Sequence, residues 1–160
     1  MIPFLAIPLY GQSMNPETGD TMKSIPSAGI PDSLSIDSIY SEIQMGFQKL
    51  EPIFERACFD CHSNRTKYPW YHKLPIVKGL IDGDIKDARR MLNMSKGFPF
   101  TGLLSPADGL KEIKLVLEKN DMPPLEYRIL HWNAKPSAEE KKAIFDWIDR
   151  GLKLISAHGE

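Results

Sequence analysis

The sequence predicts an all-α domain. Apolar residues recur at spacings of three and four in four separate stretches, and no stretch alternates apolar and polar residues as a half-buried β-strand does. Two of these stretches also begin with patterns typical of helix starts, Ser-Pro and Ser-x-x-Glu. The chain has 160 residues, of which 42% are hydrophobic and 26% charged, so one globular domain with a substantial core is expected.

The N-terminal residues show no helical periodicity. Residues 1–11 are mostly apolar and reach the small residue Gly11, which resembles a signal-peptide remnant that lacks its basic start. The alternative is a short apolar tail with no targeting role. Residues 12–36 are rich in Ser, Pro and Gly and predict a flexible, disordered leader. The folded domain is expected over residues 37–160, and no stretch reaches the roughly 18 apolar residues of a membrane span.

The first predicted helix begins at Asp37 or Ser38, either of which can cap it. Pro52 removes a backbone donor, so we expect the helix to kink or restart there and to lead into Cys58. The apolar face of this stretch consists of Ile39, Ile43, Phe47, Leu50 and Phe54.

The second predicted helix spans residues 75–93. Gly79 and Gly83 weaken its middle, so one helix or two shorter ones are expected. Its apolar face consists of Val77, Leu80, Ile81, Ile85, Ala88 and Leu92.

The last two predicted helices have the clearest boundaries. Ser105 caps the third helix, with Pro106 at its first position, and Asn120 ends it. Ser137 and Glu140 form a capping box for the fourth. We expect long ordered loops at residues 63–74 and 121–136. The inward-facing residues of the two helices are Leu110, Ile113, Leu117, Ile144, Trp147, Ile148, Leu152 and Ile155.

The charge balance argues against a nucleic-acid partner. Lys and Arg number 20 and Asp and Glu 21, which leaves a formal net charge of −1. A nucleic-acid-binding domain ordinarily shows a basic excess over its surface. Partners of another kind are therefore expected.

The segment Cys58-Phe59-Asp60-Cys61-His62 has the C-x-x-C-H pattern of c-type haem attachment. Two thiols at this spacing can form thioethers with the two vinyl groups of one porphyrin, and the next residue, His62, then lies under the iron. A zinc site would need a distant fourth ligand, because there is no second cysteine pair. A thioredoxin-like pair would need a preceding strand, and a haem-free module with two buried thiols is the remaining alternative.

The residues around this motif resemble the bacterial haem-binding domain family of single-haem c-type proteins. The resemblance covers roughly residues 50–154 and implies a helical fold similar to class I cytochromes c, with one covalently attached haem c. It also implies a periplasmic or otherwise extracytoplasmic location, because bacteria attach such haem outside the cytoplasm. The matching residues are 57–64, Thr66, 69–71, Arg90, 92–93, 122–124, Tyr127 and His131.

The second axial ligand of the iron is predicted to be Met122. Cytochrome c-like proteins place a ligating Met between the last two helices, and a thioether raises the reduction potential relative to a second His. Pro123 and Pro124 would stiffen this loop. Packing as a core methionine is the alternative, and His131 is the rival ligand.

Two further residues are candidates for contacts with the cofactor. Trp70 can donate an indole hydrogen bond to a haem propionate, and the Arg90 guanidinium can pair with one. Ordinary packing or surface solvation is the alternative for both.

These observations predict a one-electron carrier that exchanges electrons with redox partner proteins and needs no catalytic residue of its own. An electron-transfer protein is favoured over an enzyme. The alternative is a haem-based ligand sensor or a peroxidase-like enzyme, in which the sixth site is open or labile.

Overall fold

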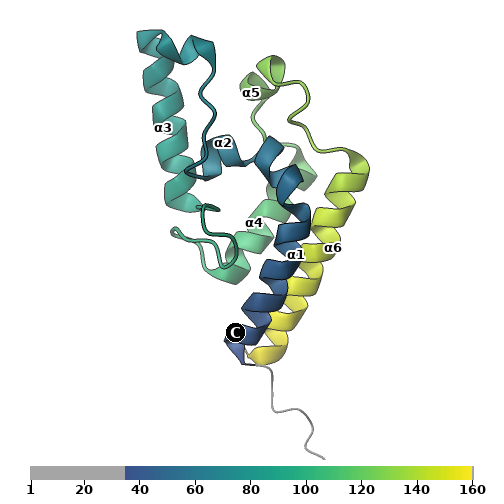
Figure 1. Ribbon diagram of the computed structural model, residues 1–160. Helices are drawn as coiled ribbons and strands as arrows, with labels where there is room; N and C mark the ends of the chain where they lie inside the picture. The colour runs from purple at the N-terminus through teal and green to yellow at the C-terminus, as the bar shows by residue number, and fades with distance from the viewer. Residues whose placement is uncertain (1–34, 160) are drawn as a thin grey trace, which may run out of the picture. The chain divides into compact units, whose positions relative to one another are not determined.

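The structure is a computed structural model that describes residues 35–159 (Figure 1). The predicted signal-peptide remnant and nearly all of the predicted leader lie outside these residues. In chain order the described helices are α1 (Ile36–Ala57), α2 (Phe59–His62), the 3₁₀ helix η1 (Trp70–Lys73), α3 (Pro75–Met91), α4 (Pro106–Lys119), α5 (Leu125–Leu130) and α6 (Ala138–His158). Over the described residues the extended pairing is limited to an isolated bridge between Asn93 and Thr101, so the all-α prediction is confirmed.

Helix α1 differs from its prediction at both the start and Pro52. It begins at Ile36, and the Ser35 hydroxyl caps it by accepting the Ser38 N–H at 3.3 Å. Pro52 lies inside an uninterrupted helix, so the predicted restart is wrong. Pro52 and Gln48, whose carbonyl loses a partner four residues earlier, are both exposed, and water can hydrogen-bond this carbonyl without a break in the helix.

Helices α1, α4 and α6 form the main core, with α6 running alongside α1 (Figure 1). The buried Trp147 indole of α6 donates a hydrogen bond to the Ile43 carbonyl of α1 at 2.9 Å. The ring centroids of Phe47 and Phe54 lie 5.0 Å apart beside it. The core is therefore aromatic where α1 and α6 meet, and burial of these rings supplies much of its stabilisation.

The predicted boundaries of α4 and α6 are confirmed. The Ser105 hydroxyl accepts the Asp108 N–H at 3.1 Å, and Asn120 ends α4 in the left-handed conformation. Ser137 and Glu140 form the complete capping box of α6. Of the predicted inward residues, Leu152 is only partly buried; the fully buried ones are Leu110, Ile113, Leu117, Ile144, Trp147, Ile148 and Ile155.

Helix α3 and the loops beside it show the largest differences from the prediction. It is one continuous helix despite its glycines, but Leu80, predicted to be inward-facing, is 65% exposed. The loop predicted at 63–74 contains η1, and the loop predicted at 121–136 contains α5. Both elements are too short to show apolar periodicity, so the sequence pattern did not reveal them.

None of the helices formed by residues 35–159 is long and apolar enough to cross a membrane.

The close approach of α1 and α6 at Gly46 gives a test of the core. A Cβ atom on Gly46 would lie 2.6 Å from Trp147 Cδ1, and the indole is packed against the rings of Phe47, Phe54 and Phe100. We expect Gly46→Ala to lower the free energy of unfolding by about 2 kcal/mol, measured by urea denaturation.

Gly79→Ala in α3 is the matched control, because nothing lies within 4 Å of the added Cβ. It should raise the stability by about 0.5 to 1 kcal/mol through helix propensity. Equal effects of the two substitutions would contradict the tight contact between α1 and α6.

Candidate cofactor-binding site

The two cysteines and the histidine lie on a single turn at the junction of α1 and α2. Cys58 ends α1 and precedes α2, and its carbonyl accepts the N–H groups of Cys61 at 3.2 Å and His62 at 2.9 Å. Both thiols are free and half-buried. The helical turn therefore holds three potential cofactor-binding side chains close together on a rigid backbone.

Burial keeps both thiols protonated near neutral pH. It raises the pKa of Cys58 to about 12, with a smaller effect from Cys61. Burial also raises the pKa of Cys61 to about 11, where the carboxylates of Asp60 and Asp84 add to the shift and Arg89 opposes it. A thiolate-based redox site would need shifts in the other direction, so these cysteines do not have the electrostatics of a reactive thioredoxin-like pair.

His62 is held by a backbone carbonyl. Its Nδ1 lies 2.9 Å from the carbonyl oxygen of Leu92, which can only accept, so Nδ1 carries the proton. Burial lowers the pKa of His62, while the carbonyls of Leu92 and Ala88 oppose this shift. The neutral ring then presents the lone pair of Nε2, the form that binds a metal.

The carbonyl that accepts from the His62 ring belongs to Leu92, the first residue after α3. The Met94 N–H also donates to the His62 carbonyl at 2.7 Å. The segment after α3 therefore holds both the ring and the backbone of His62.

The loop after the motif folds back onto Asp60. The Thr66 hydroxyl donates to the Asp60 carbonyl at 2.7 Å and accepts from Arg89 Nη2 at 2.6 Å. The Lys67 N–H donates to Asp60 Oδ1 at 2.9 Å. Asp60, between the two cysteines, is thus the residue to which the following loop is fixed.

Apolar side chains are exposed on the helices that follow the motif. On α3, Ile76 is 82% exposed and Leu80 65%. Asp84, one further turn along this stripe, is one of the two carboxylates that raise the pKa of Cys61. On α5, the side chains of Leu125, Ile129 and Leu130 are between 59% and 69% exposed. Such apolar surface beside a Cys-Cys-His turn fits a large flat apolar ring such as a porphyrin.

The two predicted sixth ligands flank α5. Met122 is 40% exposed in the loop between α4 and α5, and the next residue, Pro123, is buried. His131 ends α5, and its Nδ1 donates to the Tyr127 carbonyl at 3.1 Å, which leaves Nε2 with the lone pair of a neutral ring. Both are chemically able to bind iron, and the choice of Met122 stays a prediction.

Trp70 and Arg90 lie at the surface. Trp70 is 78% exposed, with its ring edge-on to Tyr71 at 5.7 Å. Arg90 is exposed and lies 3.6 Å from Asp87 on the same helix. The neighbouring Arg89 is the arginine that reaches the motif, through Thr66. Helical spacing separates Arg89 from Arg90 by about 100° around the axis, so the two side chains point in different directions.

Sequence reasoning included Tyr127 in the family resemblance but assigned no role to it or to Asp60. The Tyr127 hydroxyl donates to Asp60 Oδ2 at 2.6 Å. Burial, followed by this hydrogen bond, raises the pKa of Tyr127. A helical assignment for residues 125–130 would have placed Tyr127 and His131 on one face, which was the available signal.

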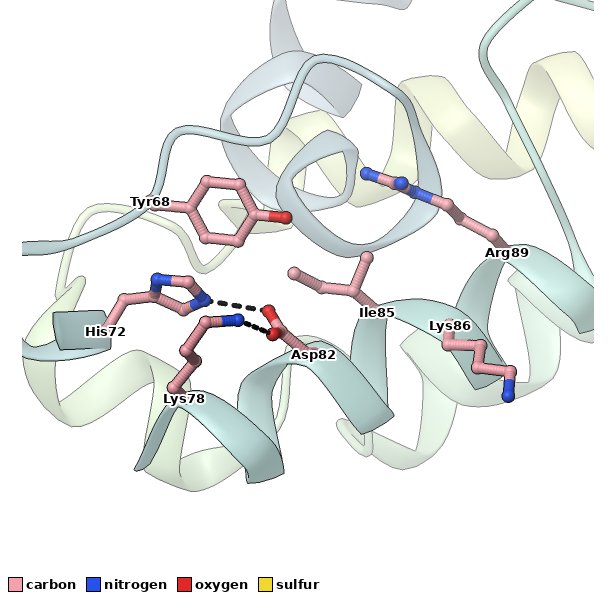
Figure 2. A pocket seen from close by; sticks show the side chains of 7 residues that line it. All are labelled: Tyr68, His72, Lys78, Asp82, Ile85, Lys86 and Arg89. Atoms are coloured by element: carbon pink, nitrogen blue, oxygen red, sulfur yellow. Dashed lines mark hydrogen bonds and ion pairs between the residues drawn. The ribbon is translucent and has the colours of Figure 1, made fainter. Parts of the chain in front are cut away.

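A separate open pocket of about 590 Å³ lies along another face of α3 (Figure 2). His72 Nε2 lies 2.7 Å from Asp82 Oδ1 there, Lys78 bonds the same carboxylate, and the Tyr68 ring lies 4.2 Å from the His72 ring. The carboxylate of Asp82 thus already has two partners. Neither the cysteines nor His62 line this pocket.

The described part of the chain contains no set of ligands for the alternative zinc site. Among residues 35–159, no three His, Cys, Asp or Glu side chains gather as they would around a metal ion. A structural zinc site ordinarily needs four such ligands. The Cys-Cys-His turn with its neighbouring apolar surface therefore fits a haem better than a lone ion.

Two comparisons with known proteins give a match. The family model described as a haem-binding domain matches residues 32–150. The chain is also 34% identical over 97 residues to a protein of Escherichia coli (strain K12) named cytochrome c peroxidase Ccp. That match covers 59% of this chain but 21% of the relative, so the chain spans about a fifth of the relative's length. No solved structure matches.

The raised pKa values predict slow thiol chemistry in the folded chain before any haem is attached. At about pH 8, both cysteines should react with iodoacetamide at least about tenfold more slowly than in urea, with Cys61 ahead of Cys58, because only the thiolate is nucleophilic. Mass spectrometry of tryptic peptides measures both rates. Asp84→Asn should speed the reaction of Cys61, whereas Asp87→Asn, on the same helix, should not; equal rates in folded and unfolded chains would contradict this.

Proposed function

Because the chain belongs to the haem-binding domain family, we propose that it carries one covalently attached c-type haem and transfers single electrons. The observation that carries this proposal is the turn formed by Cys58, Cys61 and His62, whose ring is fixed by the Leu92 carbonyl. Haem binding follows from the family, and the mode of attachment and the activity are our inference from these residues.

Each residue of the turn has a distinct role in this proposal. Cys58 and Cys61 would hold the haem through thioether bonds, and Nε2 of His62 would bind the iron. The hydrogen bond to the Leu92 carbonyl orients the imidazole and makes it a stronger donor. When bound, the haem supplies reversible one-electron chemistry at its iron.

A filled sixth site supports electron transfer, because the ligand geometry around a six-coordinate iron changes little between the ferric and ferrous states. Met122 is the proposed ligand, and the buried Pro123 beside it restrains the loop. His131 is the competing ligand. Arg89, which already reaches the motif through Thr66, replaces Arg90 as the stronger candidate for a propionate contact, and the exposed Trp70 remains a candidate.

The second candidate function is a peroxidase-like enzyme. The observation that favours it is the match to a relative named cytochrome c peroxidase Ccp. This function needs a sixth site that is open or that opens, with His131 or an arginine available to move a proton. The two functions therefore differ in how firmly Met122 would hold the iron.

The proposal also implies a location and a class of partner. Bacteria attach haem to C-x-x-C-H motifs outside the cytoplasm, so we propose a periplasmic or otherwise extracytoplasmic protein. Its partners would be redox proteins, which would approach the exposed edge of the haem. Fractionation of cells that express the full chain tests the location.

Covalent attachment is the first point to test. After expression with a signal peptide and the haem-attachment machinery, the wild-type chain should keep its haem colour through a denaturing gel. Cys58→Ala combined with Cys61→Ala should lose at least about nine-tenths of that colour, because no thioether can form. Colourless wild-type protein beside a positive control would overturn the proposal.

The identity of the sixth ligand is the second point. The reduced wild-type protein should bind carbon monoxide slowly, and Met122→Ala should bind it at least about tenfold faster and show a lower reduction potential. Stopped-flow absorbance and redox titration measure these changes.

Met91→Ala is the matched control, since Met91 has a similar exposure of 41%. His131→Ala should resemble the control if Met122 is the ligand. Rapid carbon monoxide binding by the wild type, together with turnover of hydrogen peroxide, would favour the peroxidase instead.

A further inference from the structure

Helix α5 is unusual in how it is held. Among the described residues it makes no close backbone packing with any other helix, whereas α1, α4 and α6 pack together and α3 packs on α2 and η1. Yet α5 connects Met122 to His131, the two candidate sixth ligands. Side-chain contacts must therefore determine where this segment lies.

The strongest of these contacts joins α5 to the motif itself. The Tyr127 hydroxyl donates to Asp60 Oδ2 at 2.6 Å across 67 residues of sequence. A hydrogen bond to a carboxylate is about twice as strong as one between neutral groups, and partial burial strengthens it further. Asp60 is itself immobile, because Oδ1 accepts the Lys67 N–H and its carbonyl accepts the Thr66 hydroxyl.

Tyr127 also fixes His131. Their rings are stacked with centroids 4.0 Å apart and an interplanar angle of 13°, and His131 Nδ1 donates to the Tyr127 carbonyl. Tyr71 of η1 lies beside the His131 ring at 6.5 Å. The phenol thus connects the haem-attachment turn at one end to a candidate ligand at the other.

We propose that Asp60 and Tyr127 are positioning residues that hold residues 122–131 over the attachment turn and so determine how firmly the sixth haem ligand is bound. We call this pair the Asp60–Tyr127 tether. The inference rests on the proposed function, and it assigns a use to the residue between the two cysteines. Neither residue binds the iron; both act through the ligand that α5 carries.

The tether predicts a coupling between α5 and the iron. Loss of the hydrogen bond leaves α5 without its main anchor, so the ligand leaves the iron more often and an external ligand enters more easily. The stacked ring can remain, which makes Tyr127→Phe a selective change. Tyr127 is far in sequence from the cysteines, so this variant does not alter the attachment motif.

The test compares haem-loaded variants. Reduced Tyr127→Phe should bind carbon monoxide about tenfold faster than the wild type, and its reduction potential should shift while its haem content does not. Asp60→Ala should behave in the same way. Asp60→Asn should have a smaller effect than Asp60→Ala, because its amide oxygen can keep accepting the Lys67 N–H while its NH2 group donates to the phenol oxygen.

Two controls separate a tether from a general loss of structure. Tyr68→Phe removes a half-exposed tyrosine hydroxyl on the η1 side of α3 and should change neither the rate nor the potential. Adding Tyr127→Phe to Asp60→Ala should change the rate and the potential little further, because Asp60→Ala has already removed this hydrogen bond. Full additivity would overturn the proposal.

A second readout needs no haem. Amide hydrogen exchange of residues 125–131 should be about tenfold faster in Tyr127→Phe than in the wild type, with unchanged exchange in α6. If Tyr127→Phe matches the wild type in both exchange and carbon monoxide binding, the tether is refuted. Colourless wild-type protein would instead refute the proposed function, and exchange alone would then decide whether α5 is held as proposed.

Discussion

The hydrogen bond from His62 Nδ1 to the Leu92 carbonyl joins the Cys-Cys-His turn to the segment that follows α3. His62 ends α2, which continues from the α1, α4 and α6 core, while Leu92 follows α3. The bond sets the tautomer and orientation of the ring, and the Met94 N–H holds the His62 backbone at the same place. The segment that follows α3 therefore makes the contact that leaves Nε2 of His62 with its lone pair.

The elements that could be predicted from sequence are those stabilised by local chemistry. The Ser105 and Ser137 caps, the stop at Asn120 and the inward faces of α4 and α6 follow from residues within one or two turns of each other. The restart expected at Pro52 is absent because Pro52 and Gln48 are both exposed to water, and exposure is a tertiary property. The three motif residues were found from spacing alone, but Leu92, Asp60 and Tyr127 contribute through contacts across many residues, which spacing does not encode.

The misassigned apolar face of α3 has a physical cause. Leu80 was assigned to the core because an apolar residue at helical spacing ordinarily faces other protein atoms. It is nevertheless 65% exposed, and the apolar side chains of Ile76 and Ile129 are exposed to a similar or greater extent. In a haem-binding domain the porphyrin is part of the core, so apolar residues are selected on faces that the polypeptide alone does not cover. An apolar residue that has core spacing in the sequence but is exposed in the structure is therefore a candidate for contact with the cofactor.

This division also explains why contacts to α5 matter more than its size suggests. The aromatic core around Trp147 is stabilised without any cofactor, because α1 and α6 bury Phe47 and Phe54 directly. Helix α5 has no such core, and its apolar residues are exposed. The position of α5 would then depend on the cofactor and on the hydrogen bond from Tyr127 to Asp60. Because α5 has few contacts, a ligand that it carries could stay on the iron or leave it. Whether the protein transfers electrons or reacts with peroxide would then depend on how firmly these contacts hold α5.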